Sequence, residues 1–198
     1  MLKHIKTVHF RRKREGKTNY KKRLKILISN KIRMVVRKSL KNIYAQLIEY
    51  RDNGDIVKFS ASSSEIRKLG WKISGSNMPA SYLTGYLLGK KAVKKNMDEA
   101  ILDIGRIPPI KGSKVFAVVK GAKDAGINIP VDNEMLPSDD DVKGNRISNY
   151  GKLLGGDNMR YSRYYSSYLK IGLKPEEVSN LFSEVKKNLE SSDKIKQG

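Results

Sequence analysis

The first 25 residues constrain this chain most, because they contain eleven Lys or Arg residues and a single acid, Glu15. No apolar periodicity accompanies these charges before Leu24. A segment of this composition cannot bury enough apolar surface to offset the entropy that it loses on ordering. We therefore expect a basic arm over residues 1–28 that stays disordered until a polyanion binds it, and a folded core that begins after it.

The excess of positive charge extends beyond this arm. Across 198 residues, 41 Lys and Arg stand against 20 Asp and Glu, which gives a net charge of +21 and a pI near 10.0. A compact fold with this charge repels itself unless a polyanion neutralises it. Nucleic acid is therefore the expected partner, and the alternative is a solvated basic surface without a specific ligand.

Residue types that are missing or rare exclude several classes of protein. The sequence has no cysteine, which rules out disulfides, thiolate zinc sites and cysteine nucleophiles and fits a reducing, cytoplasmic location. No apolar run approaches 18 residues and no apolar signal core follows the first charges, so we expect neither a membrane span nor a secretion signal. Both histidines, His4 and His9, lie in the arm, where we expect solvated or nucleic-acid-facing side chains rather than metal ligands.

Three strands are predicted directly after the arm. Residues 32–38 alternate apolar and basic side chains, residues 42–50 are rich in β-forming types, and residues 55–61 contain three large apolar side chains. The Asn53-Gly54 step between the second and third of these segments is a strong hairpin signal. We therefore expect an antiparallel three-strand meander.

Two helices should follow the meander. Ser63 or Ser64 can cap a short helix that ends at Gly70. Asn77 can cap a longer helix that runs to about residue 95. Four residues form the expected inward face of this longer helix: Leu83, Tyr86, Leu87 and Val93.

Two glycines interrupt the longer helix, at Gly85 and Gly89. Each weakens a helix by about 1 kcal/mol relative to Ala. A cost of this size indicates that another backbone approaches closely at these positions, and we expect that backbone to be the sheet.

Strands then alternate with helices. We predict a short strand over residues 100–104, a helix capped by Ser113 that ends at Gly126, and another short strand over residues 127–131. A meander followed by α, β, α, β describes an α/β fold with a mixed sheet, in which the later strands are joined by right-handed crossovers. We assign residues 29–131 to this α/β core domain.

The remaining residues, 132–198, are predicted to form an extended loop and a C-terminal helical extension. The stretch to about residue 156 contains Pro137, an acidic run at residues 139–141 and several glycines, and we expect it to be a loop or linker. Four tyrosines then recur at helical spacing: Tyr161, Tyr164, Tyr165 and Tyr168. A final helix starts at Pro175 and has an apolar stripe: Val178, Leu181, Phe182, Val185 and Leu189.

We expect the chain not to be an enzyme and to bind no cofactor, metal or small-molecule substrate. Gly85 to Lys91 resembles a phosphate loop, but it has three residues between its glycines instead of four and Lys where Ser or Thr is needed. The enzyme alternative is an RNA-processing nuclease that uses Asp103 and the acids at 139–141. Two-metal chemistry needs several acids within about 4 Å, and the meander contributes none that points inward. Asp103 is more simply a carboxylate that fixes its own loop.

The first two strands offer a surface for RNA. Arg33, Val35 and Arg37 share one face of the first strand, because side chains alternate. Tyr44 and Gln46 lie opposite the apolar face of the second strand, so they can join the two arginines or simply be a solvated polar face. Arginine binds phosphate in a bidentate manner and stacks on exposed bases, as RNA loops offer, so this surface suits RNA better than DNA.

A second mixture of arginine and tyrosine occurs in the tail, at Arg160, Arg163 and the tyrosines around them. The mixture suits base stacking on RNA. Tyrosines at helical spacing also commonly cover a small core, and the sequence leaves both interpretations open. Trp71, between Lys68 and Lys72, has the same two interpretations, with core packing favoured.

Several motifs, in order along nearly the whole chain, resemble those of archaeal-type members of the ribosomal protein L eighteen family, whose eukaryotic counterpart is ribosomal protein L five. The motifs that carry the resemblance are Asn19-Tyr20-Lys21-Lys22-Arg23, residues 32–39, Ala45-Gln46, residues 67–71, residues 79–89, Leu102-Asp103-Ile104-Gly105, residues 111–126 and Gly172-Leu173-Lys174-Pro175-Glu176. Two segments depart from the family: Arg106-Ile107-Pro108-Pro109 replaces a more polar stretch, and the acids at 139–141 are unusual near rRNA, so we expect them to face solvent or a basic neighbouring protein.

The resemblance implies a structural protein of the large ribosomal subunit that binds 5S rRNA. It also implies that the protein helps to attach 5S rRNA to the large-subunit rRNA, among neighbouring proteins of the central protuberance. The residues expected to contact RNA, from the arm, the early strands and the tail, are Arg11, Arg12, Lys13, Arg14, Lys17, Tyr20, Lys21, Lys22, Arg23, Lys25, Arg33, Arg37, Lys38, Tyr44, Gln46, Arg160 and Arg163.

Overall fold

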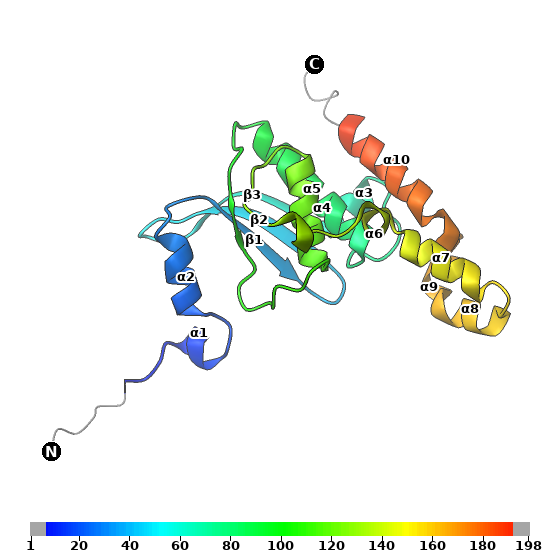
Figure 1. Cartoon of the computed structure of the whole chain (residues 1–198), viewed down its shortest axis with the longest axis horizontal. Coiled ribbons are helices and arrows are strands. Elements are labelled where there is room, and N and C mark those ends of the chain that lie inside the picture. The colour runs from blue at the N-terminus through cyan, green and yellow to red at the C-terminus, as the bar shows by residue number, and fades with distance from the viewer. Residues whose placement is uncertain (1–6, 192–198) are drawn as a thin grey trace.

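The computed structural model describes residues 7–191, and a mixed four-stranded sheet lies at its centre (Figure 1). Its strands are β1 (Arg33–Lys38), β2 (Ile43–Glu49), β3 (Ile56–Ser62) and β4 (Ile101–Asp103). The strand order is β3-β2-β1-β4, with β1 antiparallel to β2, β2 antiparallel to β3, and β1 parallel to β4. This arrangement confirms the α/β fold and the three-strand meander, including its turn at Gly54, where φ is +131°.

Helices cover one face of the sheet (Figure 1). They are α3 (Ser63–Lys68), α4 (Met78–Val93) and α5 (Lys114–Asp124). The predicted cap of α4 is confirmed, since the Asn77 side chain accepts a hydrogen bond from the Ala80 amide at 3.0 Å. The cap of α3 is Ser62, one residue earlier than expected, because Glu65 completes a capping box with it. Met34, Val36 and Leu47 from the strands are buried with Leu88 and Val118 from the helices.

Helices α4 and α5 cross at their glycines. A Cβ built on Gly85 would lie 1.9 Å from the Val118 carbonyl oxygen, and one on Gly121 would lie 2.1 Å from that of Tyr82. Gly89 faces Ala125 in the same way. The close backbone that these glycines accommodate is therefore helix α5, and the expectation that it is the sheet is wrong. The crossing also leaves Val93, assigned to the inward face, 41% exposed at the end of α4.

The strand expected at residues 127–131 is reduced to one isolated bridge between Asn128 and Glu99. Ile127 and Ile129 are still buried in the core, so the apolar pattern was interpreted correctly. The ladder cannot continue, because Pro130 has no N–H to donate and Gly126 enters the segment at φ +111°.

Residues 132–156 are mostly helical, and the expectation of an extended loop is wrong. They form a 3₁₀ turn at Asn133–Met135, then α6 (Asp139–Lys143) and α7 (Asn145–Leu154). Ser138 caps α6 by accepting from the Asp141 amide at 3.2 Å, and the acidic run forms the first helical turn, where the helix dipole favours negative charge. Lys120 Nζ donates a hydrogen bond to Asp139 Oδ1 at 2.6 Å, and this bond lowers the pKa of the Asp139 carboxyl group.

The tail forms short helices and one long one. These are α8 (Asn158–Tyr164), α9 (Ser166–Leu169), a 3₁₀ turn at Pro175–Glu177, and α10 (Val178–Ser191). The predicted stripe of α10 is confirmed, because Val178, Phe182, Val185 and Leu189 are buried in a second apolar cluster with Trp71 and Leu83. This cluster attaches the C-terminal helix to the side of α4 that faces away from the sheet. Among residues 7–191, no helix has both the length and the apolar character needed to span a bilayer.

The glycine crossing predicts a large effect for Gly85→Ala. The new methyl group meets the backbone of α5, so we expect unfolding free energy to fall by about 3 kcal/mol, despite the better helix propensity of Ala. Thermal unfolding should shift down by roughly 6–12 °C. Gly156→Ala is the control, because a Cβ there has nothing within 4 Å, and it should change stability by less than about 0.5 kcal/mol. Equal melting temperatures for the two variants would contradict the close contact between Gly85 and the backbone of α5.

A pH dependence follows from Tyr165, which is 7% exposed. Its burial, followed by the neighbouring Tyr168 and Tyr150, raises its pKa to about 12 from an ordinary value near 10. Between these values the unfolded chain loses the proton first, so stability falls as pH rises, by up to about 1.4 kcal/mol per pH unit. We expect urea unfolding from pH 9.5 to 11.5 to show a shallower decline for Tyr165→Phe, while Tyr164→Phe, at an exposed position, keeps the wild-type slope.

Candidate nucleic-acid interface

The face of the sheet that the helices leave open carries a row of polar residues. Strand register pairs Arg37 with Tyr44 and Val35 with Gln46, and these four side chains point to the same side. Strand β3 extends the row, because Ser62 pairs with Tyr44. The alternation expected for β1 and β2 is therefore confirmed. Arg37 and Tyr44 are each about half exposed on this face.

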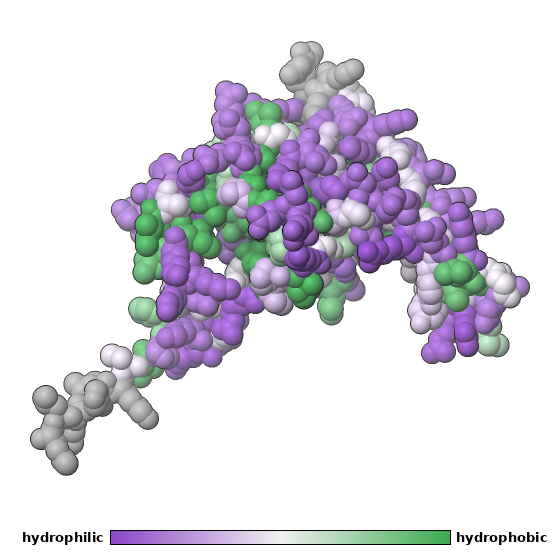
Figure 2. Space-filling model, in the orientation of Figure 1, coloured by the Kyte–Doolittle hydropathy of each residue, from purple (hydrophilic) through white to green (hydrophobic). Residues whose placement is uncertain are grey.

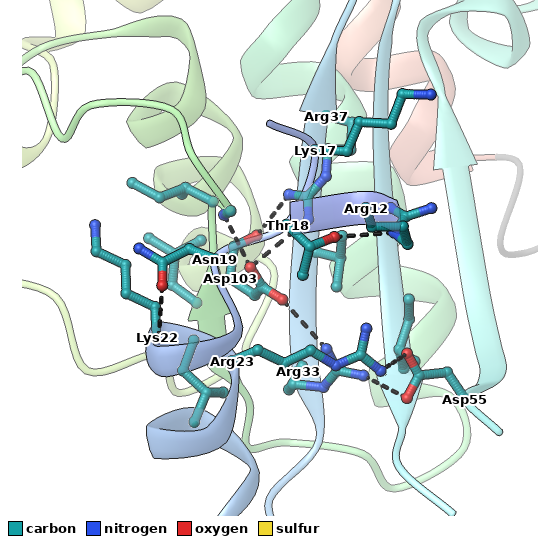
Figure 3. A pocket seen from close by; sticks show the side chains of 16 residues that line it. Arg12, Lys17, Thr18, Asn19, Lys22, Arg23, Arg33, Arg37, Asp55 and Asp103 are labelled. Carbon is teal, nitrogen blue, oxygen red and sulfur yellow. Dashed lines mark hydrogen bonds and ion pairs between the residues drawn. The ribbon is translucent and has the colours of Figure 1, made fainter. Parts of the chain in front are cut away.

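The basic arm lies beside this open face, and its expected lack of structure is wrong for much of its length (Figure 3). It contains two helices, α1 (Arg11–Arg14) and α2 (Tyr20–Leu27). Asn19 caps α2 by accepting a hydrogen bond from the Lys22 amide, and the ring of Phe10 contacts that of Tyr20 at 5.3 Å between centroids. These local contacts, which composition does not reveal, order residues without any buried side chain in either helix. His4 lies outside the described residues, and His9 is exposed.

Arg33 differs most from what its position in the sequence predicts. It is only 2% exposed, so the expectation that it offers a guanidinium to solvent is wrong. Its Nη2 lies 2.7 Å from Asp55 Oδ1, and its Nη1 donates to Asp103 Oδ2 at 3.2 Å. The contact with Asp55 is an ion pair without an aligned hydrogen bond, because Nη2 and Nε have no hydrogen-bond partner within the described part of the chain. Two carboxylates compensate this charge, because a buried cation is costly unless it is paired.

The two carboxylates that hold Arg33 also hold the arginines on either side of it. Arg23, on α2, donates to Asp55 Oδ2 at 2.9 Å, which ties the arm to the turn before β3. Arg37 donates to the backbone oxygen of Asp103 at 3.1 Å, and its Nη2 lies 3.7 Å from Asp103 Oδ1. The five side chains alternate in charge across the open face (Figure 3). We call them the charge ladder: Arg23, Asp55, Arg33, Asp103 and Arg37.

Asp103 fixes its own loop, as expected. Its Oδ1 accepts a hydrogen bond from the Gly105 amide at 2.8 Å, and Gly105 adopts φ +64°, a conformation that favours glycine. The loop after β4 is thereby held against Arg37. The alternative role, in a nuclease site, would require other acids beside it. Asp139 instead pairs with Lys120, Asp141 pairs with Arg146, and residues 7–191 contain no group of three His, Cys, Asp or Glu side chains suited to a metal ion.

A groove of about 290 Å³ runs between the arm and the open face. Its rim is cationic, whereas the acids that line it, Asp55 and Asp103, are already paired with arginines. The cationic lining residues are Arg12, Lys17, Lys22, Arg23, Arg33 and Arg37. Arg12 is oriented by its Nε, which donates to the Thr18 hydroxyl at 2.9 Å. The groove therefore has the charge and the shape to accept part of a polyanion.

The structure brings most of the predicted RNA-contacting residues to one region. The predicted arm cations from Arg11 to Lys25 are exposed, except for Arg23, which is partly buried. Lys38 lies at the end of β1 near Lys114, whose pKa is lowered by burial and secondarily by the charge of Lys38. Arg160 and Arg163 lie instead on α8, at the opposite end of the molecule from the arm (Figure 1). Sequence reasoning missed Thr18 and Arg106, which help to line the grooves around the arm. The departure from family pattern at 106–109 was the available signal for Arg106.

Removing one carboxylate from the charge ladder should cost far more than removing a surface pair. Asp103→Asn leaves the buried Arg33 with Asp55 as its remaining partner, and we expect the unfolding free energy to fall by about 3 kcal/mol. Glu134→Gln breaks an exposed pair with Lys111 and should cost less than about 1 kcal/mol. Urea denaturation of both variants tests the difference. Similar stabilities would show that Arg33 needs no compensation from Asp103.

This arrangement agrees with one comparison to known families. A family model described as ribosomal large subunit proteins 60S L5 and 50S L18 matches residues 5–101. The match includes α1, α2, the meander, α3 and α4, and it ends at the first residue of β4. The match therefore includes four of the five charge-ladder residues, which lie along the arm and the open face, and it stops just before the fifth, Asp103. Members of this family have a structural role in the large ribosomal subunit. Through residues 5–101, the chain belongs to the family of ribosomal large-subunit proteins 60S L5 and 50S L18.

Proposed function

We propose that this protein binds 5S rRNA and helps to attach it to the large-subunit rRNA in the central protuberance. The observation that carries the proposal is the cationic groove between the arm and the open face of the sheet, whose acids are already paired. The family supports a ribosomal role, and the net charge of +21 supports a polyanionic partner.

The two sides of the groove suit different kinds of contact. The exposed arm cations can neutralise backbone phosphates, which positions an RNA without selecting its sequence. They are Arg11, Arg12, Lys13, Arg14, Lys17, Lys21, Lys22 and Lys25. On the sheet, Arg37 and Tyr44 lie side by side and Gln46 follows on the same face, so planar groups can meet unpaired bases there. Tyr20 adds an aromatic ring at the start of α2.

In this proposal Arg33 positions other arginines, whereas the sequence suggested that it contacts RNA directly. Arg33 no longer counts as an RNA contact, because its guanidinium is covered and faces two carboxylates. Through Asp55 it positions Arg23 and the arm, and through Asp103 it positions Arg37. The selectivity of the face thus depends on a residue that does not reach its surface.

The three-part division expected from the sequence also becomes part of the proposal. Residues 1–28 serve as the arm, residues 29–131 as the core, and residues 132–198 as an extension toward large-subunit rRNA or neighbouring proteins of the central protuberance. The extension is not independent of the core, because α10 and Trp71 share one apolar cluster. It therefore projects from the core in a defined direction.

Salt dependence tests the proposed phosphate contacts. Labelled 5S rRNA is titrated with the wild type and with a variant that carries Arg11→Gln, Arg14→Gln and Lys21→Gln, between 50 and 200 mM salt. Each lost contact should reduce the slope of log K against log salt by roughly 0.7–0.9, so we expect a reduction of about 2 to 3. The three side chains are exposed and lie outside the charge ladder, so the fold should be unaffected.

A variant of equal charge is the matched control. Lys68→Gln, Lys95→Gln and Lys187→Gln remove three exposed cations from the helical side of the sheet, and should leave the slope for 5S rRNA near the wild-type value. Equal slopes for the two triple variants would reject the arm as the phosphate contact. Failure of 5S rRNA to bind the wild type more tightly than an unrelated structured RNA would reject the proposed function. RNA cleavage in Mg²⁺ that Asp103→Asn abolishes would favour the nuclease instead.

A further inference from the structure

Five tyrosines gather in the C-terminal extension, far from the charge ladder (Figure 1). Four of them come from α7, α8 and α9, namely Tyr150, Tyr161, Tyr164 and Tyr168, and the fifth, Tyr165, lies between α8 and α9. Ring centroids are 5.4 Å apart for Tyr161 and Tyr165, 5.5 Å for Tyr165 and Tyr168, and 5.8 Å for Tyr150 and Tyr164. The sequence left open whether these rings form a small core or a stacking surface, and the structure separates them into two groups.

The inner group has a structural role. Tyr165 lies at the centre and its hydroxyl donates to the Ile147 carbonyl oxygen at 3.2 Å. Tyr161 donates to Glu176 Oε2 at 3.0 Å, which links α8 to the 3₁₀ turn before α10. Tyr168 is largely covered, and burial raises its pKa. Tyr165 is buried and Tyr161 and Tyr168 are partly covered, so these three rings pack against one another between the short helices.

The outer group has no such role. Tyr164 is 65% exposed and Tyr150 is 42% exposed, and neither hydroxyl has a hydrogen-bond partner within residues 7–191. Their rings meet edge to face, at an interplanar angle of 80°. Leu153, one turn after Tyr150, is 80% exposed. Figure 2 shows a small hydrophobic spot on the surface of this end of the molecule, bordered by hydrophilic residues. We call Tyr150, Leu153 and Tyr164 the tyrosine platform.

The charges around the platform indicate what covers it. Residues 145–171 contain five basic residues and one acid, Asp157, which is paired with Arg160 at 3.3 Å. In the described part of the chain, Lys152 and Arg163 have no carboxylate partner, although they flank the exposed tyrosines in sequence. A partner that offers both flat apolar faces and negative charge satisfies rings and cations together. Unpaired RNA has these properties, because every base has a stacking face and every linkage a phosphate.

We propose that the tyrosine platform is a second RNA-binding site, which stacks one or two unpaired bases on Tyr164 and Tyr150 while Lys152 and Arg163 contact the adjoining phosphates. The inference rests on the proposed RNA-binding function, and it adds a separate site with a different ligand. The arm and the sheet groove hold a structured RNA mainly through its phosphates, with unpaired bases meeting only the face at Arg37 and Tyr44, whereas the platform binds mainly by stacking single-stranded bases. Its place at the other end of the molecule allows the two sites to hold two segments of RNA at once.

The test isolates base stacking from the electrostatic binding of the arm. Two labelled probes are used with the full chain, a 10-nucleotide single-stranded RNA of mixed sequence and an abasic oligomer of the same length and charge. Both contact cations, but only the first can stack. We expect the wild type to prefer the base-containing probe by on the order of 5- to 150-fold for each stacked base. The double variant Tyr150→Leu, Tyr164→Leu should reduce that preference by the factor expected for the two lost rings, and binding of the abasic oligomer should stay unchanged.

Matched variants distinguish stacking from general apolar contact and from unfolding. The double variant Tyr150→Phe, Tyr164→Phe keeps both rings and should keep the preference. Tyr164→Leu alone, at the more exposed ring, should lose part of it with an unchanged melting temperature. Equal binding of both probes to the wild type would overturn the platform, and so would a preference that is undiminished in the leucine variants. If the wild type does not bind 5S rRNA preferentially but still prefers the base-containing probe, the proposed function is rejected and the platform is not.

Discussion

The compensation of one buried guanidinium organises the side of this protein that we propose to bind RNA. Arg33 points from β1 into the space under the arm, where a lone cation would be strongly unfavourable. Asp55 comes from the turn before β3 and Asp103 from the end of β4, so neutralising one charge brings three separate segments together. Each carboxylate then holds a further arginine, Arg23 or Arg37, at the edge of the groove. The cations on the rim are positioned by paired acids, and a polyanion can approach without breaking the pairs.

The opposite side of the sheet follows a different constraint, which decides where the open face lies. Gly85, Gly89 and Gly121 allow α4 and α5 to approach until their backbones touch, so the two helices form one thin layer over the strands. Met34 and Val36 are buried beneath that layer, and alternation places Arg33 and Arg37 on the other side. The same two helices carry the second apolar cluster on their outer surface, which anchors α10. Both the groove and the C-terminal extension are therefore placed by one helix crossing.

Local patterns predicted the elements of the fold, and long-range contacts decided what the residues in them do. Alternation identified β1 and β2 with their faces, and Asn77 marked the start of α4, because each signal lies within a few residues. Ser138 and Gly144 are equally local signals of α6 and α7, but the loop prediction rested on the acidic run, Pro137 and the number of glycines instead. The burial of Arg33 was not predictable, since Asp103 lies far along the chain and meets it only after β4 pairs with β1. The partner of Gly85 was missed for the same reason.

The tyrosines of the tail show how one sequence pattern can carry two roles. A stripe at helical spacing gives no means of separating Tyr165 from Tyr164, yet the first is covered and the second is exposed, because α8 ends between them. The arm likewise shows that a helical segment need not contribute to a core, because neither α1 nor α2 buries a side chain. Helices this short are marginal without tertiary support. The arm has a cap at Asn19 and an ion pair at Arg23, while most of its cations between residues 7 and 28 are exposed to solvent. A bound phosphate backbone would supply the missing counter-charge, so order in the arm and affinity for RNA should rise together.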